Sequence, residues 1–475
     1  MLEKRFKLKE NNTTAKTEIV AGITTFMTMA YIIALNPNIL TNYGQGGQPL
    51  WNGVFLATCI ASAIGMFTMA FLANKPFCLG PGMGINSFFA VVVANLITIT
   101  GMDFVWSFQT VMCLVFIEGV VFVILSLFNI REKIVEAIPL GVRLGISPAI
   151  GLMLMNIGFG SNIYIADENF NQFFVMRDFF GALTASRAKE VMGTAYPVMV
   201  LSVITLFVGF FTIVILAHKG VRASVIIGML VASVVYWCGE LVVFGTNPFE
   251  SLTTASFVPA FSDMASTTLF KLNFAGLASL GWFTVIVLVL TFCLIDMFDT
   301  IGTLVGTASR AGMLDKNGNM PQMKEALLSD AIGTVAGSLT GTSTITTFIE
   351  SASGVEAGGR TGLTSLTTGI LFLACVFLSP VAAIIPAAAT SSALVYVGIL
   401  MVKGLKSINF DDIAVSVPVA IMLIAMPISG SIGHAIGLGM ISFTVIKVLI
   451  GKAKEVSVLT YVISVLFLVK FFLAL

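Results

Sequence analysis

Charged residues are scarce in this chain. Asp, Glu, Lys and Arg make up 10% of its 475 residues, whereas hydrophobic residues make up 57%. Soluble globular domains carry about 25% charged residues, so this composition excludes a water-soluble globular protein and predicts an integral membrane protein. The formal net charge is only +1, and nothing in the charge balance indicates a polyanionic partner such as nucleic acid.

Cysteine is also rare, and the motifs of several enzyme classes are missing. The six cysteines lie in or beside apolar stretches without any Cys-x-x-Cys spacing, so we interpret them as small buried hydrophobic residues instead of metal ligands. The sequence contains no Walker loop, no dinucleotide fingerprint after a strand, no His-Glu-x-x-His and no Gly-x-Ser-x-Gly. These absences argue against an ATPase and against a hydrolytic enzyme, and we predict no cofactor and no metal.

Long apolar runs fill most of the sequence. A helix crosses the hydrocarbon core with about 20 residues, and we predict fourteen membrane segments at 17–36, 51–73, 83–98, 104–129, 140–157, 195–217, 223–243, 283–305, 326–339, 349–360, 363–385, 387–402, 411–428 and 430–450. The third, ninth and tenth are too short to cross alone as helices. A last apolar stretch, 456–475, either spans the membrane or lies along its cytoplasmic interface, and we prefer the interface.

Basic residues predict the orientation. Lys4, Arg5, Lys7, Lys9 and Lys16 precede the first segment, and every second short connection after it is also basic, which predicts a cytoplasmic N-terminus. The first ten residues are polar and lack a signal-peptide core, so we expect the first segment itself to direct insertion. Fourteen segments divide into seven plus seven, and an odd number in each half predicts an inverted repeat.

Two interrupted segments occupy the same ordinal position in the two halves. The third segment opens with 75–86, which contains Gly80, Pro81, Gly82 and Gly84, and the tenth opens with the β-branched run 341–350. The glycines and the proline prevent regular helix and allow close approach of the backbone. Extended backbone cannot face lipid, because its polar groups would lack partners. Such a pair of segments is a sequence indicator of a binding site near the middle of the membrane.

Three carboxylates stand out in this apolar chain. Glu350 ends the β-branched run, and Asp296 and Asp299 are three residues apart in the eighth segment. A carboxylate at membrane depth costs several kcal/mol unless it is paired, protonated or exposed to water. Residues i and i+3 share one helix face, and two carboxylates so close repel each other, which favours proton binding by one of them. The alternative for either aspartate is a helix cap or a bond to nearby backbone.

Other polar and aromatic residues are weaker candidates. Asn86 carries a donor and an acceptor that suit the edge of a heterocycle, although it could also be a cap. Phe26 could stack on a flat ligand. We interpret Glu118 as structural, and Asp330 and Arg360 as structural or gating residues.

Four separated motifs make the chain recognisable. Residues 21–31, 80–90, 298–302 and 346–355, followed by 357–362, resemble the AzgA-like branch of the nucleobase:cation symporter-2 family, the adenine and guanine/hypoxanthine permeases. The resemblance runs from about residue 4 to about residue 474. It implies an all-α polytopic membrane protein with a seven-plus-seven inverted repeat and short strands in segments 3 and 10.

The resemblance also implies two domains and a site. A core domain would contain 17–129 and 283–385, and a gate domain 140–243 and 387–450, with 456–475 as a C-terminal segment. The purine would lie between the two strands and the eighth segment. In the family, the acidic residue of the eighth segment lies two positions before an Ile-Gly pair. In this chain that position is Asp299, and not Asp296. The implied substrate-binding residues are Glu350, Asp299, Asn86, Gly84, Ile85, Phe26, Thr347, Phe348, Ile349 and Ser351, and the implied proton-coupling residues are Asp299, Glu350 and Asp296.

The implied function is secondary active import of a purine nucleobase across the plasma membrane by proton symport, with an elevator-like motion. Hypoxanthine and guanine are slightly preferred over adenine on the resemblance, and relatives often form homodimers through the gate domain. The alternative is an anion exchanger or channel on the same fold. An anion site would favour helix N-termini and arginine over two carboxylates, so we prefer the nucleobase.

Overall fold

Helices form most of the structure, as the apolar sequence predicts. The computed structural model describes residues 2–42, 44–128, 139–159, 164–166, 172–174, 195–253, 255–310, 313, 320–429 and 432–473. Within these ranges, nine helical stretches are long and apolar enough to cross a membrane, and four further apolar helices are shorter. The prediction of a polytopic helical membrane protein is therefore confirmed, whereas the count of fourteen segments stays a prediction.

The first half of the chain begins with one compact set of helices and continues with a second. The first set is α1 (Leu2–Phe6), α2 (Ala15–Met29), α3 (Ile32–Leu40), α4 (Gln48–Thr68), η1 (Met69–Ala73), β1 (Leu79–Pro81), α5 (Met83–Thr100) and α6 (Phe104–Leu127). The second is α8 (Leu140–Phe159), β2 (Tyr164–Ala166), β3 (Gln172–Phe174), α11 (Ala195–His218), α12 (Ser224–Gly239) and η3 (Glu240–Phe244).

The second half follows after three short helices. They are α13 (Glu250–Thr253), α14 (Phe261–Thr267) and α15 (Phe274–Ser279). Next come α16 (Trp282–Arg310), α17 (Met323–Thr340), β4 (Ile345–Thr347), α18 (Ser351–Glu356), α19 (Gly362–Ala374), η4 (Cys375–Leu378) and α20 (Ser379–Ala383). The chain ends with α21 (Ala387–Val402), η5 (Lys403–Ser407), α22 (Ile413–Ser429), α23 (Ile432–Leu449), η6 (Ala453–Glu455) and α24 (Val458–Leu473).

Parts of the predicted domains lie outside the described residues. These parts are residues 43 and 129 of the first core segment, 160–163, 167–171 and 175–194 of the first gate segment, 311–312 and 314–319 of the second core segment, 430–431 of the second gate segment, and 474–475 at the C-terminus. The predicted first segment, 17–36, is divided into α2 and α3, with Ala30 and Tyr31 at the break.

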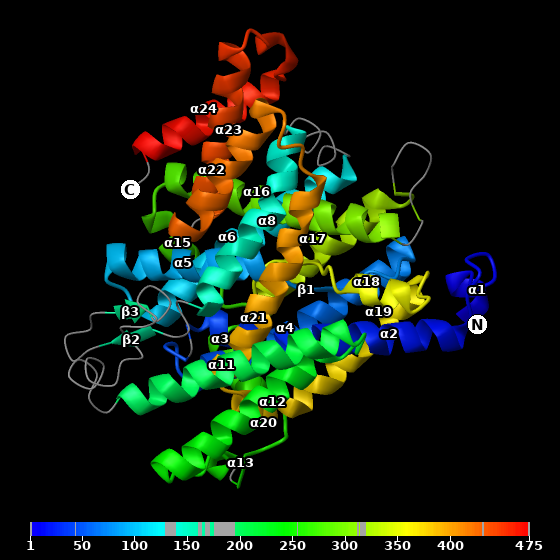
Figure 1. Ribbon diagram of the computed structural model, residues 1–475, viewed down its shortest axis with the longest axis vertical. Helices are drawn as coiled ribbons and strands as arrows, with labels where there is room; N and C mark the ends of the chain where they lie inside the picture. Colours follow the sequence, from blue (N-terminus) through cyan, green and yellow to red (C-terminus); the bar gives the residue numbers. More distant parts are fainter. Residues whose placement is uncertain are drawn as a thin grey trace.

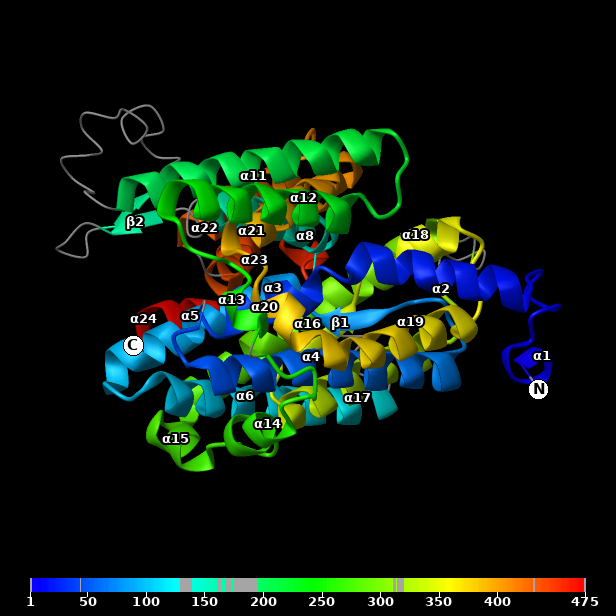
Figure 2. The same ribbon diagram turned by 90° about the horizontal axis from the view of Figure 1, so that it is seen from below.

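The helices pack in two groups. In the first group, α6 and α4 pack against α17, and α2 and α4 pack against α19. In the second group, α8 packs against α21 and α22, and α11 packs against α12 and α21. Figure 2 shows α11 and α12 along one side of the molecule and α4, α6 and α17 along the other, with β1 between them. Each group combines elements from both halves of the chain (Figure 1).

The two short strands meet at the centre of the molecule. β1 pairs antiparallel with β4, with Leu79 opposite Thr347 and Pro81 opposite Ile345. Gly82 N donates to Thr344 O at 3.1 Å, and Phe348 N donates to Cys78 O at 2.9 Å, which extends the pairing beyond both ends. The strands thus satisfy each other's backbone groups inside protein, as extended backbone at membrane depth requires. α5 follows β1, and α18 follows β4.

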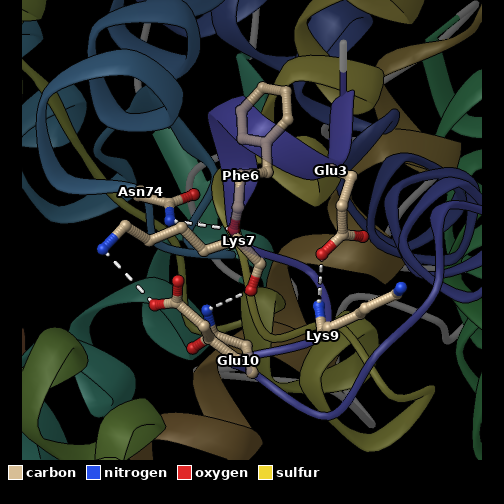
Figure 3. A network of polar contacts seen from close by, with 7 residues as sticks. Glu3, Phe6, Lys7, Lys9, Glu10 and Asn74 are labelled. Carbon is tan, nitrogen blue, oxygen red and sulfur yellow. Dashed lines mark hydrogen bonds and ion pairs between the residues drawn. The ribbon is translucent and has the colours of Figure 1, made fainter.

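The N-terminal segment is fastened to the first group (Figure 3). Asn74 Nδ2 donates to Phe6 O at 3.1 Å, and Asn74 Oδ1 accepts from Gly362 N at 2.9 Å. The Phe6 side chain is buried in a small apolar cluster with Leu8, Ala70 and Leu363. Asn74 has a φ of 50°, a left-handed conformation that asparagine tolerates better than most residues. It therefore links the N-terminal segment to the start of α19.

The C-terminal helix α24 packs on α23. The hydroxyls of Thr444 and Ser464 lie 2.8 Å apart between the two helices, whereas Val458 and Val465 on α24 are exposed apolar side chains. Lys447 Nζ donates to Glu455 Oε2 at 2.6 Å across the connection. Whether the predicted segment 456–475 spans the membrane or lies on its surface stays a prediction.

Candidate functional site

A cavity lies where the paired strands meet both groups of helices. It holds about 430 Å³ of empty space, a figure that includes the open solvent at its mouth. The first group supplies most of the wall, and α8 and α21 of the second group supply the rest. The lining residues are Tyr31, Gly82, Met83, Gly84, Ser147, Asp299, Thr303, Thr346, Thr347, Phe348, Ile349, Glu350, Val397 and Met401.

Glu350 reaches this cavity from the junction between β4 and α18. It is the N-cap residue of α18, and its carbonyl accepts from Ser353 N at 2.9 Å. Tyr31 OH donates to Glu350 Oε1 at 2.8 Å, and the Tyr31 side chain is only 1% exposed. One carboxylate oxygen is therefore held by a rigid phenol, which orients the carboxylate within the cavity.

Asp299 faces the same cavity from α16, and Thr303 lies one turn further along that helix. Asp299 on α16 and Glu350 at the β4–α18 junction thus converge on one space. Carboxylates accept hydrogen bonds when ionised and can also donate when protonated.

Asp296 has a different environment, although it is only three residues away. It is fully buried and does not line the cavity. Thr300 Oγ1 lies 3.1 Å from Asp296 Oδ1 and 2.9 Å from Asp330 Oδ1. Asp330 is also fully buried, so this hydroxyl connects two carboxylates behind the cavity wall. The i and i+3 spacing predicts that both aspartates face the same space, whereas in the structure only Asp299 lines the cavity.

Strand β4 contributes two hydroxyls without hydrogen-bond partners. Thr346 is fully buried and Thr347 is 2% exposed, and within the described part of the chain neither Oγ1 atom has a partner. Buried hydroxyls are normally satisfied, and both residues line the cavity. A ligand with polar edges could supply the missing partners.

Some predicted site residues line the cavity and some do not. The cavity wall includes Glu350, Asp299, Gly84, Thr347, Phe348 and Ile349. Ile85 is buried in the apolar core. Phe26 packs edge-on against Phe372, with ring centroids 5.7 Å apart. Ser351 Oγ accepts from Cys78 N at 2.9 Å and so braces the strand pair.

Asn86 also lies outside the wall. It is fully buried, and its amide bonds to Asn36 and Ser343. It therefore belongs to the layer behind β4, where it contacts the residues that lead into the strand.

The sequence prediction missed several wall residues. Tyr31, Thr346 and Thr303 lie within or beside the quoted motifs, but no local pattern separates them from neighbouring residues. Ser147 precedes Pro148 inside the apolar helix α8, and this hydroxyl in an apolar run is the one signal that could have identified it. Among the described residues, no group of three or more His, Cys, Asp or Glu is arranged to hold a metal ion.

A cavity between two helix groups that contains two carboxylates and is bounded by interrupted apolar segments is typical of a membrane transporter. The chain belongs to the Permease family, because the family model Xan_ur_permease matches residues 16–432. The family resemblance predicted from the motifs is thus confirmed. The chain is a permease and not an enzyme.

Curated relatives cover nearly the whole chain. A permease homologue from Methanocaldococcus jannaschii is 40% identical over 99% of this chain and 98% of its own. The adenine permease AdeP of Escherichia coli is 36% identical over 99% of this chain and 96% of its own. The guanine/hypoxanthine permease PbuO of Bacillus subtilis is 35% identical over 98% of this chain and 100% of its own.

Solved structures share the fold at low sequence identity. The transmembrane domain of the cyanobacterial bicarbonate transporter BicA has a TM-score of 0.59 at 14% identity, covering 89% of this chain and 97% of that one. The murine anion transporter Slc26a9, in an inward-facing state, has a TM-score of 0.58 at 13% identity, covering 92% of this chain and 68% of that one. These likenesses concern the fold alone.

Proposed function

We propose that this permease imports a purine nucleobase by proton symport. The observation that carries the proposal is the convergence of Glu350 and Asp299 on one cavity beside β4. The names of AdeP and PbuO, an adenine permease and a guanine/hypoxanthine permease, support a purine as the solute. A purine is flat and neutral, and its edges carry N–H donors and ring acceptors that suit carboxylates and threonine hydroxyls.

Glu350 is the main binding residue in this proposal. Tyr31 occupies Oε1, which leaves Oε2 and the second lone pair of Oε1 to accept from N–H groups of the purine. Thr346 and Thr347, whose hydroxyls lack partners among the described residues, can donate or accept at another edge. A purine N–H left without its acceptor in a dry site would cost about 1–3 kcal/mol.

Asp299 is the coupling residue in this proposal, assisted by Glu350 and, behind the wall, Asp296. An ionised carboxylate is expensive at membrane depth, so a proton that arrives with the purine would neutralise the loaded site before it moves. Asp299 faces the cavity, whereas Asp296 shares the Thr300 hydroxyl with Asp330. Asp296 would therefore affect coupling indirectly.

The cavity wall suggests how access alternates. Ser147, Val397 and Met401 come from the second helix group, and the carboxylates come from the first. We assign the first group to a core domain (17–129 and 283–385) and the second to a gate domain (140–243 and 387–450) of a seven-plus-seven inverted repeat. The core domain would carry the solute past the gate domain in an elevator-like motion. A plasma-membrane location, a cytoplasmic N-terminus and a homodimer through the gate domain complete the proposal.

Anion exchange is the second candidate, because BicA and Slc26a9, an anion transporter by name, share the fold. Two carboxylates in the cavity oppose it, since they repel an anion. Uptake of labelled hypoxanthine, guanine, adenine, xanthine, uracil and bicarbonate in cells lacking their own transporters distinguishes the candidates. We expect purine uptake, with hypoxanthine and guanine ahead of adenine. Uptake of bicarbonate without any purine would overturn the proposed function.

A further inference from the structure

Five buried polar side chains form one hydrogen-bonded network behind β4. Asn86 Nδ2 donates to Asn36 Oδ1 at 2.7 Å, and Asn86 Oδ1 accepts from Ser343 Oγ. Asn36 Nδ2 donates to Thr58 Oγ1 at 2.7 Å and to Thr342 Oγ1 at 2.9 Å. All five residues are fully buried.

The orientation of each amide follows from the carbonyl at one end of this network. Thr58 Oγ1 donates its only hydrogen to Val54 O at 2.7 Å, so it must accept from the neighbouring amide nitrogen of Asn36. The Asn36 oxygen then faces Asn86, which must present its own nitrogen there. The oxygen of Asn86 is left to accept from Ser343. Every donor in this series of hydrogen bonds faces an acceptor. A flipped amide would instead place two donors or two acceptors against each other.

The network joins three helices of the first half of the chain to the segment that leads into β4. Asn36, Thr58 and Asn86 lie on α3, α4 and α5, whereas Thr342 and Ser343 precede β4 in the second half. Thr344 completes the attachment, because its Oγ1 donates to Glu118 Oε2 at 2.8 Å. Each residue of 342–344 is therefore held by a side chain of the first half.

The residues held in this way determine where the cavity wall lies. Only Ile345 separates Thr344 from the two wall threonines, and Glu350 follows three residues after Thr347. A strand has no slack over such a length, so a shift of 342–344 shifts β4. An isolated buried hydrogen bond contributes modestly to stability, but a connected network specifies one geometry.

We propose that Asn36 and Asn86 are positioning residues of the substrate site. They fix segment 342–344 and thereby the positions of Thr346, Thr347 and Glu350, without contacting the solute. The inference rests on the proposed function only for the identity of that solute. A network that merely stabilises the fold would lower the melting temperature without changing the affinity or the ranking of solutes.

The test compares Asn86→Asp, Ser343→Ala and Ser343→Thr with Ser62→Ala in the purified full-length protein. Asn86→Asp keeps the acceptor for Ser343 and loses the donor to Asn36, and Ser343→Thr keeps the hydroxyl. Ser62 lies one turn after Thr58 on α4, is fully buried, and has no hydrogen-bond partner among the described residues. It is the matched control. Melting temperature and binding constants for hypoxanthine and adenine are measured for each variant.

We expect Asn86→Asp and Ser343→Ala to weaken binding about tenfold, the effect of one misplaced hydrogen bond, and to change the hypoxanthine-to-adenine ratio. Ser343→Thr and Ser62→Ala should stay near the wild type. Hydrogen exchange gives a second measurement that needs no solute. The Gly82 and Phe348 amides, which bond across the strand pair, should exchange faster in Ser343→Ala than in Ser62→Ala.

Hydrogen-exchange rates of the Gly82 and Phe348 amides that are the same in Ser343→Ala and Ser62→Ala would overturn the positioning role. Purine affinities of Asn86→Asp and Ser343→Ala equal to those of Ser62→Ala would also overturn it. If the wild-type protein binds no purine, the proposed function fails, and the exchange comparison still decides the role of the network.

Discussion

Tyr31 donates a 2.8 Å hydrogen bond to Oε1 of Glu350 across 319 positions of sequence. The contact joins the break between α2 and α3 to the junction between β4 and α18. Both residues line the cavity, so the phenol fixes the carboxylate at the place where the solute would bind. The break between α2 and α3 and the junction between β4 and α18 therefore form one part of the cavity wall together.

Tyr31→Phe removes this hydrogen bond and keeps the ring. A hydrogen bond to a charged group is worth about 1.5–3 kcal/mol, so binding of the preferred purine should weaken by about tenfold or more, with a small loss of thermal stability. Isothermal titration calorimetry measures the change. Tyr461→Phe is the control, because Tyr461 OH bonds to Ala453 O at 3.0 Å, away from the cavity. Equal affinities for the two variants would contradict an orienting role.

Glu350→Gln replaces an acceptor oxygen by a donor without changing the shape of the side chain. The purine N–H groups then face an N–H group, so binding should fall by a factor of ten or more, consistent with about 1–3 kcal/mol for each unsatisfied group. The measurement is equilibrium binding of labelled hypoxanthine to the purified variant. Glu10→Gln, on the exposed N-terminal segment, is the control. Full affinity in Glu350→Gln would remove Glu350 from the binding site.

Ser147→Leu adds apolar volume to the cavity wall from the second helix group. The leucine side chain would occupy cavity space that the solute needs, so KM for purine uptake should rise while expression and melting temperature change little. Ser202→Leu is the control, because Ser202 is a half-buried serine of α11 that does not line the cavity. If KM is unchanged in Ser147→Leu, the gate side of the cavity does not contact the solute.

The Lys447–Glu455 contact predicts a pH-dependent contribution to stability. The hydrogen bond from Lys447 lowers the pKa of the Glu455 carboxyl from its usual value. A lowered pKa in the folded state stabilises the protein above the unfolded pKa of about 4.3, and this contribution disappears as the pH falls through the folded pKa. Glu455→Gln should therefore melt slightly below the wild type at pH 7.

The same difference should shrink as the pH falls below about 4.3 and vanish once the pH is below the folded pKa of Glu455. The effect is small because Glu455 is exposed and surface pairs contribute little. Glu10→Gln is the control, since the Lys7–Glu10 pair is 3.3 Å apart with both side chains more than half exposed. A Glu455→Gln deficit that is the same at pH 4 and pH 7 would exclude the ion pair as its cause.

Residues with a strong local signal could be predicted from the sequence. Glu350 and Asp299 are conspicuous because charge is rare in this chain, and the structure has both on the cavity wall. Pro81 and the β-branched run before Glu350 disfavour helix, and the structure has a strand at each place.

Residues whose position depends on distant partners could not be predicted. Tyr31 reaches the cavity wall because the helix is interrupted between α2 and α3. No pattern in the sequence predicts this interruption. Asn86 has the chemistry of a binding residue, but Asn36 and Ser343, 50 and 257 positions away, take up its amide. The spacing argument applies equally to Asp296 and Asp299, but Asp296 bonds to the Thr300 hydroxyl, which also contacts Asp330 behind the wall.

Coupling is tested most directly in proteoliposomes that contain wild-type protein, Asp299→Asn or Asp296→Asn. Labelled hypoxanthine is present at equal concentration on both sides, and an inward proton gradient is imposed. The wild type should concentrate the purine until the proton gradient is dissipated. Asp299→Asn should bind it and exchange it without concentrating it, and Asp296→Asn should be milder. Accumulation by Asp299→Asn at the wild-type level would contradict proton coupling through Asp299.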